Sequence, residues 1–345
     1  MKKYYTLLLL CCLLPAVLFA GGKKDTGTVH STDTESHATP AAPVRQTEYT
    51  VKAVIPNGAP AVCAAKMLTD RPAVTQNSQT LYEVLQAPEA LQARLISGEA
   101  DVAIVPANLA AVLYAKSVPI RFAGAVVWGI LYGLTSEPIN SLEDLKGKDI
   151  LTFGRGLTPD ITIREILESY RLTPDKDVTF TYVQSASEAA SAFISGKASI
   201  AIIPEPMVSI VLSKKPETQV FLDVQKAWKE KLGGESSYPQ AVVVMTKKLI
   251  EEHPDYAARF LRELEQSTAW AKENPAQAGE YTARVHQGIP AQIIAKGVSR
   301  MNIGFVPADS ARPALEKYFS ILKKANPKFI GGALPQDDFY YTPEK

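Results

Sequence analysis

Short apolar runs alternate with amphipathic stretches along most of this chain. The clearest pattern is written twice: residues 95–106 read LISGEADVAIVP and residues 193–204 read FISGKASIAIIP. In each copy a helical stretch ends at Ser-Gly, four or five apolar positions suit a buried strand, and a proline that cannot continue the ladder ends the run. Because helix, turn, strand and terminal proline recur together, the pattern predicts two similar lobes.

Strand-type runs alternate with helical patterns around both copies, which favours α/β lobes with mainly parallel sheets. The predicted strands are 49–55, 80–85, 102–105, 149–153, 178–183 and 200–203. Helices are predicted from about Pro60 and Pro88, over 160–170 and 186–194, from Pro254 and Pro275, and over 311–324. Two further apolar stretches, 129–135 and 241–246, are interpreted as hinge strands that cross between the lobes.

The first residues have the pattern of an export signal. Two lysines precede an almost unbroken apolar stretch from Tyr4 to Phe19, and small residues follow, so residues 1–20 are predicted to be a secretory leader. Gly22 stands where a lipoprotein would carry its lipidated cysteine. An uncleaved leader has almost the length of a membrane-spanning helix, so tethering stays open. Residues 21–46 are polar and predict a disordered linker.

Charge and cysteine content narrow the classes of partner. The 345 residues include 37 basic and 36 acidic side chains, so no nucleic-acid partner is indicated. Beyond the leader only Cys63 remains, in a stretch that reads as an apolar helix, so it is expected to pack in the core. Four scattered histidines build no metal cluster and no catalytic triad. A monomer without cofactor or metal is expected.

A glycine loop before a helix is the sharpest local motif. Residues 153–160 read FGRGLTPD. Gly154 and Gly156 allow close approach of the backbone to a ligand, and Thr158 is placed to cap the helix. The amides of the first turn favour an anionic or polar group, to which Arg155 adds charge. The loop lacks the dinucleotide fingerprint and the Gly-Lys-Ser/Thr loop, which argues against a nucleotide enzyme.

Further loops follow the other predicted strands. Residues 56–60 read PNGAP, which again is a strand end, a glycine turn with Asn57, Gly58 and Ala59, and a helix. Asn108 follows the first repeated strand, and Glu205 follows the second, where it can bind an amine or bond to loop amides. Trp128 and Tyr238, each beside a predicted hinge, are candidates for an aromatic wall. Arg164, four residues after Asp160, is expected to form an ordinary helix ion pair.

With these motifs the chain resembles the extracytoplasmic solute-binding proteins of ABC transporters, in the group that includes taurine, alkanesulfonate, nitrate and thiamine-precursor binders. The resemblance covers nearly everything from Tyr49 onward and rests on five segments: PNGAP at 56–60, SGEADVA at 97–103, LEDLKGK at 142–148, GRG at 154–156 with Pro159-Asp160, and Glu205-Pro206.

The resemblance implies the type II periplasmic binding protein fold, in which two Rossmann-like α/β lobes are joined by two hinge strands. Lobe one would be residues 47–135 with 240–345, and lobe two residues 136–239. Such proteins close on a small-molecule solute and then dock on a membrane permease that works with an ATPase. By analogy, the solute contacts would come from Asn57, Gly58, Asn108, Gly154, Thr158 and Glu205.

Two other functions stay open at this stage. One is an exported sensor or interaction protein with the same fold. The other is an enzyme, because related folds carry out pyrimidine synthesis and menaquinone-pathway chemistry; export and the absence of a cysteine-rich motif argue against it. The solute is left between an anion, such as a sulfonate or nitrate, and a neutral heteroaromatic vitamin precursor. The expected location is the periplasm or the cell envelope.

Overall fold

The computed structural model describes residues 49–85, 88–233, 237–285 and 288–342, which all belong to one compact unit, Arg45–Lys345. The leader predicted at 1–20 and the linker predicted at 21–46 lie outside the described residues. Within the described part, no helix combines the length and the hydrophobicity needed to cross a membrane.

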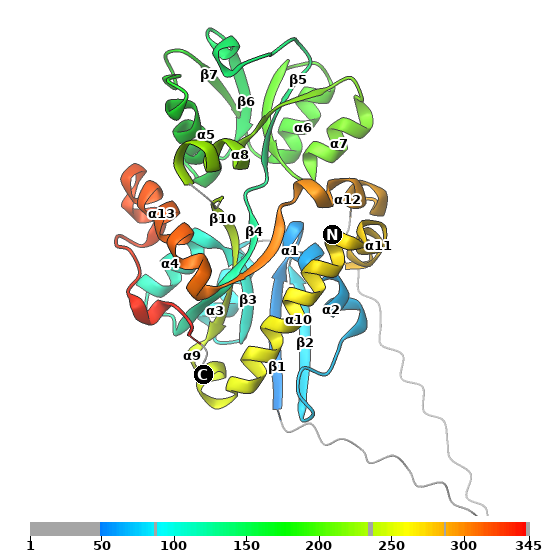
Figure 1. The fold of residues 1–345 in the computed structure, drawn as a ribbon, viewed down its shortest axis with the longest axis vertical. Helices are drawn as coiled ribbons and strands as arrows, with labels where there is room; N and C mark the ends of the chain where they lie inside the picture. Colours follow the sequence, from blue (N-terminus) through cyan, green and yellow to red (C-terminus); the bar gives the residue numbers. More distant parts are fainter. Residues whose placement is uncertain (1–48, 86–87, 234–236, 286–287, 343–345) are drawn as a thin grey trace, which may run out of the picture. The chain divides into compact units, whose positions relative to one another are not determined.

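Two β-sheets organise the described chain (Figure 1). The first has six strands in the order β11-β4-β10-β3-β1-β2 and the second has five in the order β7-β6-β8-β5-β9. The strands of the first sheet are β1 (Tyr49–Pro56), β2 (Ser78–Leu85), β3 (Val102–Pro106), β4 (Ile120–Trp128), β10 (Pro239–Thr246) and β11 (Ile303–Pro307). Those of the second are β5 (Leu131–Thr135), β6 (Asp149–Phe153), β7 (Thr179–Val183), β8 (Ile200–Pro204) and β9 (Gln219–Asp223).

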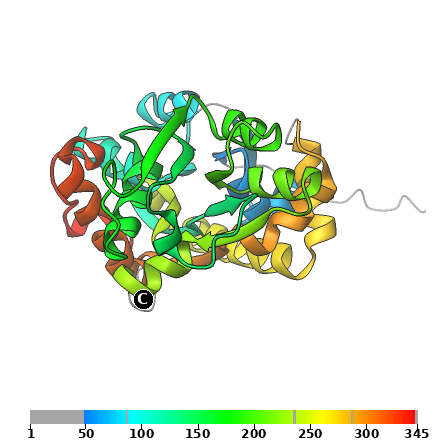
Figure 2. The same cartoon turned by 90° about the horizontal axis from the view of Figure 1, so that it is seen from above.

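Helices cover both faces of the first sheet, because its strands are apolar on both faces. Alternate residues of β3 show this: Val102 and Ile104 join one buried cluster, and Ala103 and Val105 join another. Figures 1 and 2 show α13 and the helices α10 to α12 on opposite sides. One face carries α1 (Ala59–Cys63), α2 (Ala65–Asp70), α9 (Lys247–Glu252), α10 (Pro254–Glu273), α11 (Pro275–Val285) and α12 (Ala291–Gly297); the other carries α3 (Pro88–Ile96), α4 (Ala107–Ala115) and α13 (Ala308–Ala325).

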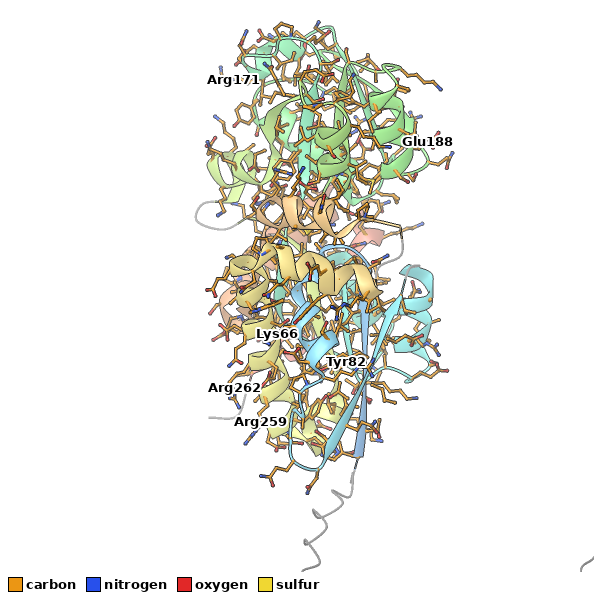
Figure 3. All side chains as sticks on the ribbon, turned by 90° about the vertical axis from the view of Figure 1, so that its right-hand side faces the viewer. Lys66, Tyr82, Arg171, Glu188, Arg259 and Arg262 are labelled. Carbon is orange, nitrogen blue, oxygen red and sulfur yellow. The ribbon has the colours of Figure 1, made fainter. Side chains whose placement is uncertain are left out.

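The second sheet is covered in the same way. The helices on its two faces are α5 (Thr158–Ser169) with α8 (Val224–Trp228), and α6 (Ala186–Ile194) with α7 (Met207–Lys214). Short helical turns complete the chain: η1 (Leu142–Leu145), η2 (Lys229–Gly233), η3 (Val298–Arg300), η4 (Pro327–Ile330) and η5 (Asp337–Phe339). Charged side chains such as Arg171, Glu188, Arg259 and Arg262 lie exposed on the outer surface (Figure 3).

The repeated sequence is repeated structure, as predicted. Helices α3 and α6 end just before the Ser-Gly pairs, and Gly98 and Gly196 both adopt left-handed φ angles of 71° and 76°. A left-handed residue at this position satisfies the last carbonyls of a helix, and glycine adopts it without strain. The strands that follow, β3 and β8, occupy equivalent places, since each lies beside a strand antiparallel to it.

The boundary between the lobes differs from the expectation in one strand. Residues 129–135 were interpreted as a hinge strand within lobe one, yet β5 pairs along its whole length with β8 and β9 of the second sheet. The crossing is therefore the short segment of Gly129 and Ile130. The second expected hinge, residues 241–246, lies inside β10, which is paired on both sides within the first sheet. Local hydrophobicity identified these strands but not their partners.

The buried core contains Cys63, as the sequence predicted. Cys63 is fully buried in α1, where desolvation raises the pKa of its thiol well above the ordinary range. Its Sγ–H points to the backbone oxygen of Val126 at 3.5 Å. The hydroxyl of Thr268 donates to the backbone carbonyl oxygen of Cys63 at 3.4 Å. The residue therefore packs in the core of the first sheet, as its apolar neighbours predicted.

Candidate functional site

The direction of the strands places four loops at the junction of the two sheets. Strand β4 runs into the junction, because β5 of the other sheet follows it directly. Strand β10 is antiparallel to β4 and β3, so β3 and its parallel neighbour β1 also end there. Strand β8 is antiparallel to β5, so β8 and its parallel neighbour β6 end there too. Open α/β sheets bind ligands at such carboxyl ends.

The first sheet contributes the loops after β1 and β3. The turn between β1 and α1 holds Asn57 and Gly58, whose φ of 85° requires glycine, and the amide of Gly58 donates to Oδ1 of Asn57 at 3.0 Å. Ala59 is buried at the start of α1. Asn108 is half-buried in the first turn of α4, and its side-chain amide has no hydrogen-bond partner among the described residues. That amide is available to a guest.

The second sheet contributes the glycine loop after β6. Gly154 and Gly156 have φ angles of 68° and 69°, as a glycine turn requires. The expected cap by Thr158 is wrong: Thr158 is the first residue of α5, Leu157 is its N-cap, and no side chain caps it. Instead, the carboxylate of Asp160 reaches back and accepts the amide of Gly156 at 2.7 Å. An internal carboxylate therefore occupies part of the position proposed for an anion.

Asp160 is the centre of a network that fixes this loop. Its Oδ1 accepts from Nε of Arg164 at 2.8 Å and from the hydroxyl of Tyr182 at 2.7 Å. The helix ion pair predicted between Arg164 and Asp160 is thus confirmed. The guanidinium of Arg155 lies 5.3 Å from the centre of the Tyr182 ring, on an exposed side chain. The loop is rigidly held, and Arg155 is its exposed charge.

Glu205, at the end of β8, is bound by protein groups. Its Oε1 accepts from Nε of Arg300 at 2.5 Å and from the hydroxyl of Ser209 at 3.0 Å, and its Oε2 accepts from the amide of Ser209 at 3.2 Å. Burial raises the pKa of this carboxyl, and the Arg300 guanidinium opposes that effect. Of the two roles left open for Glu205, the structure shows the one that satisfies internal donors.

The Arg300 contact joins the two sheets. Arg300 ends η3, which follows α12 on the first sheet, whereas Glu205 follows β8 of the second. The backbone oxygen of Arg300 accepts from the hydroxyl of Tyr132 in β5 at 2.8 Å. Asn302 adds a bond from its Nδ2 to the carbonyl of Gly129 at 2.9 Å, at the crossing segment. Sequence reasoning did not identify Arg300 or Asn302, because their partners are far away in the chain.

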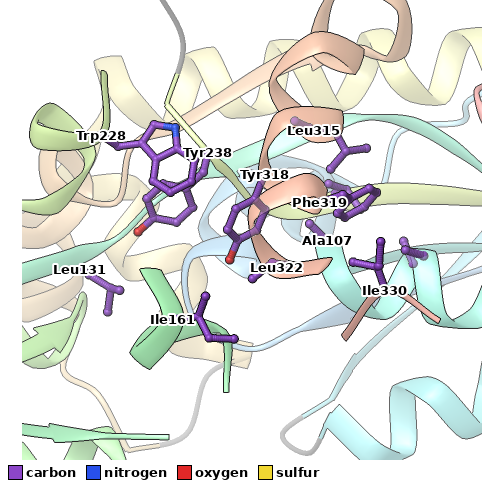
Figure 4. Close-up of a cluster of buried hydrophobic side chains, with 14 of the residues drawn as sticks. Ala107, Leu131, Ile161, Trp228, Tyr238, Leu315, Tyr318, Phe319, Leu322 and Ile330 are labelled. Atoms are coloured by element: carbon purple, nitrogen blue, oxygen red, sulfur yellow. The ribbon is translucent and has the colours of Figure 1, made fainter. Parts of the chain in front are cut away.

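The two aromatic candidates have different surroundings. Tyr238 is fully buried and packs against Trp228 and Tyr318 with ring centroids 4.9 and 5.2 Å apart (Figure 4). Burial raises the pKa of Tyr318 to about 12, although hydrogen bonds with Thr162 and Thr158 of α5 oppose this shift. Tyr238 is thus a core residue that links the sheets. Trp128 is half-buried and lines a cavity, with Nε1 bonded to the carbonyl of Gly304 at 2.8 Å.

This cavity, which we call the hinge cavity, has a volume of about 920 Å³. It is lined by residues from both sheets: Trp128, Asp223, Gln225, Lys226, Lys229, Ser237, Lys272, Pro275, Ala295, Val298, Ser299, Asn302, Ile303, Val306 and Ser310. Of the residues predicted for the site, only Trp128 belongs to it. The loops of Asn57, Asn108, Gly154 and Glu205 belong to the junction at the strand ends. This junction is the place proposed below for the solute, and we call it the strand-end cleft. In the described part of the chain, no group of three or more His, Cys, Asp or Glu side chains is placed to hold a metal ion.

Two α/β lobes with facing strand ends, joined at the short crossing of Gly129 and Ile130, define the class of type II periplasmic binding proteins. The chain belongs to the family described as NMT1/THI5 like, whose profile matches residues 58–278. Among curated proteins, none matches its sequence.

Solved structures of similar fold include an ABC transporter protein from Parabacteroides distasonis, 26% identical with a TM-score of 0.73, over 86% of this chain and 99% of that one. The periplasmic aliphatic sulphonate binding protein SsuA from Escherichia coli is 17% identical with a TM-score of 0.66, over 86% and 93% of the two chains. The periplasmic nitrate-binding protein NrtA from Synechocystis PCC 6803 is 14% identical with a TM-score of 0.52, over 73% and 70%.

Proposed function

We propose that this protein is the extracytoplasmic solute-binding component of an ABC importer. It captures a small organic molecule in the strand-end cleft, closes by bending between the two lobes, and delivers the molecule to a membrane permease that works with an ATPase. The observation that carries the proposal is the meeting of four strand ends from two sheets, with the unpartnered amide of Asn108 among them. The family and the solved structures of similar fold support a solute-binding role.

The chemistry of the cleft favours an organic solute over a bare inorganic anion. The carboxylate of Asp160 already accepts the amide of Gly156. The carboxylate of Glu205, which directly follows β8, is buried. Arg164 and Arg300 pair with these two carboxylates, so their charges are offset. A small anion would nevertheless find the Gly156 amide already taken, with Arg155 as the exposed cation of the glycine loop. A molecule with several hydrogen-bonding groups uses the Asn108 amide and the loop backbone instead.

A thermal-shift screen tests the proposal. The chain from Gly22 onward is heated with sulfonates, nitrate, pyrimidines, flavins and amino-acid derivatives. A true solute at a hundred times its dissociation constant adds about 2.7 kcal/mol to the free energy of unfolding, which raises the melting temperature visibly. We expect one chemical class to produce the shift and to be recovered unchanged. Turnover of the bound compound would contradict a pure binding role.

Replacing Asn108 tests the location of the site. Asn108→Leu removes one amide hydrogen-bonding group from the strand-end cleft, so the solute found in the screen should bind about tenfold more weakly. The matched control is Asn77→Leu, since Asn77 is exposed and precedes β2 at the opposite end of the strands. Calorimetric titration of both variants measures the difference. Equal affinity in the two variants would exclude Asn108 from the site.

A further inference from the structure

The hinge cavity is separated from the strand-end cleft by the order of the strands. In the first sheet, β4 and β10 lie between β11, which lines the cavity, and β3, which ends at the cleft. In the second sheet, β5 lies between β9, whose Asp223 lines the cavity, and β8. No residue of the four cleft loops lines the cavity. A molecule in the cavity therefore occupies a different place from a solute in the cleft.

The charged lining of the cavity is dominated by lysines. Lys226 in α8 and Lys229 at the start of η2 are three residues apart and share a helical face, and Lys272 comes from the last turn of α10. These three ammonium groups form no ion pair within the part of the chain that the structure describes. The carboxylate in the lining, Asp223, accepts the amide of Lys226 at 2.9 Å as the cap of α8. The cavity is therefore positively charged.

A buried serine lies beside the cavity. Ser237 is 5% exposed and lines the cavity, but its Oγ is enclosed by protein and forms no hydrogen bond with any described residue. The class of ligand is therefore inferred from the lysines, and Lys226 and Lys229 favour an anionic group.

The remaining lining sets the rest of the ligand. The ring of Trp128 and the side chains of Val298, Ile303 and Val306 supply an apolar wall. A volume of about 920 Å³ falls within the range of small-molecule sites, roughly 300–1,000 Å³. We propose that the hinge cavity is a second binding site, which takes an organic anion: a carboxylate or sulfonate on an apolar or aromatic body. Its acidic group contacts the lysines, and its body lies against Trp128.

A ligand in the hinge cavity would also change how the two lobes are arranged. Lys226 and Lys229 belong to the second lobe, whereas Lys272 and Trp128 belong to the first. A molecule that contacts both lobes binds most tightly in one arrangement of them. It then changes the affinity of the cleft for the solute, and the solute changes the affinity of the hinge cavity for this molecule by the same factor. The second site is therefore a means of regulating solute capture.

The test uses benzenesulfonate as the anionic probe and benzenesulfonamide as its neutral counterpart, titrated calorimetrically into the full chain at low salt. We expect benzenesulfonate to bind at least about tenfold more tightly than the sulfonamide. Added salt should weaken the binding of benzenesulfonate and leave that of the sulfonamide unchanged. Lys226→Gln/Lys229→Gln should weaken the binding of benzenesulfonate by about tenfold or more. The control Lys323→Gln/Lys324→Gln removes two exposed lysines of α13 and should leave the affinity unchanged.

The outcomes separate the two proposals. The second site is supported if Lys226→Gln/Lys229→Gln weakens the binding of benzenesulfonate and Asn108→Leu does not. This holds whether the titration shows one binding site or two. Binding that only Asn108→Leu weakens places the anion in the strand-end cleft, which overturns the second site and leaves the proposed function standing. Absence of saturable binding of benzenesulfonate, or equal loss in the Lys323/Lys324 control, also overturns the second site.

Discussion

At the scale of single residues, Glu205 and Arg300 form the most deeply buried ion pair between the lobes. The Glu205 side chain is 0% exposed, and its carboxylate oxygens accept from Arg300 and twice from Ser209. A carboxylate with this set of donors has little capacity left for a ligand amine. The pair therefore holds α12 and η3 against the end of β8 and shapes the wall of the strand-end cleft.

Arg300→Met should destabilise the protein by about 3 kcal/mol, because it leaves a buried carboxylate without its cation. The free energy of unfolding from urea denaturation measures the loss. Because Glu205→Gln removes the buried charge, the double variant Glu205→Gln/Arg300→Met should be less destabilised than Arg300→Met alone. A double variant at least as unstable as the single one would show that the charge of Glu205 is not what Arg300 offsets.

Residue-level prediction succeeded where the partner was close in sequence. The Arg164–Asp160 pair follows from a spacing of four residues on one helix, and it forms. The partner of Glu205 lies 95 positions away, and nothing local in the sequence points to it. Likewise, Thr158 is expected to cap α5 from a place before the helix, but α5 begins at Thr158 itself and Leu157 is its N-cap. Long-range contacts and helix boundaries are decided by the fold.

At the scale of elements, Arg164 ties α5 to the segment before β7 and to β7 itself. Its guanidinium bonds to Asp160 within α5, to Asp175 at 2.6 Å and to the hydroxyl of Tyr182 at 2.9 Å. The Arg164 guanidinium lowers the pKa of the Asp175 carboxyl below its ordinary value of 3.8. This contact secures the helix that carries the glycine loop.

The Asp175 contact should make stability depend on pH in the acid range. Because the carboxyl has a lower pKa in the folded than in the unfolded protein, its contribution is present above the ordinary value of 3.8 and is lost as pH falls through the folded-state pKa. The free energy of unfolding, measured from about pH 5 to about pH 2.5, should fall less steeply for Asp175→Asn than for the wild type. Parallel curves would show that Asp175 contributes no pH dependence.

Elements were predictable from sequence where their pattern was periodic or bounded by glycine and proline. Helix α6 was predicted at its observed bounds, and β6 likewise. Strand β4 was not predicted, although Phe122 to Val127 are all buried, because a continuous apolar run does not distinguish a strand from a buried helix. The assignment of β5 to a sheet depends on pairing with β8, and that pairing leaves no local trace.

At the scale of the whole described molecule, the two lobes share one hydrophobic cluster. It contains Val54 and Phe122 of the first sheet together with Ile150 and Ile202 of the second. The aromatic group of Trp228, Tyr238 and Tyr318 belongs to it and joins α8, the residue just before β10, and α13 (Figure 4). A shared core couples the stability of the lobes, since neither can unfold without exposing part of the other.

Unfolding of the protein without solute should therefore be a single transition. Tryptophan fluorescence reports on Trp228 in the shared cluster together with Trp128 and Trp270 of the first lobe. Far-ultraviolet circular dichroism reports on all the helices. We expect the two signals to coincide along a urea titration. Two separated transitions would show that the lobes are independent folding units and that the aromatic group does not couple them.

Cys63 gives the molecule one more property. In the chain from Gly22 onward, as used in the thermal-shift screen, it is the one cysteine, and it is fully buried with the pKa of its thiol raised. A buried, protonated thiol does not react readily with alkylating dyes. Ser97 and Ser195, exposed at equivalent positions of the two repeated segments, are therefore natural places for a donor and an acceptor fluorophore. Each lobe would carry one label on an unaltered background, and single-molecule energy transfer would follow the opening and closing of individual molecules.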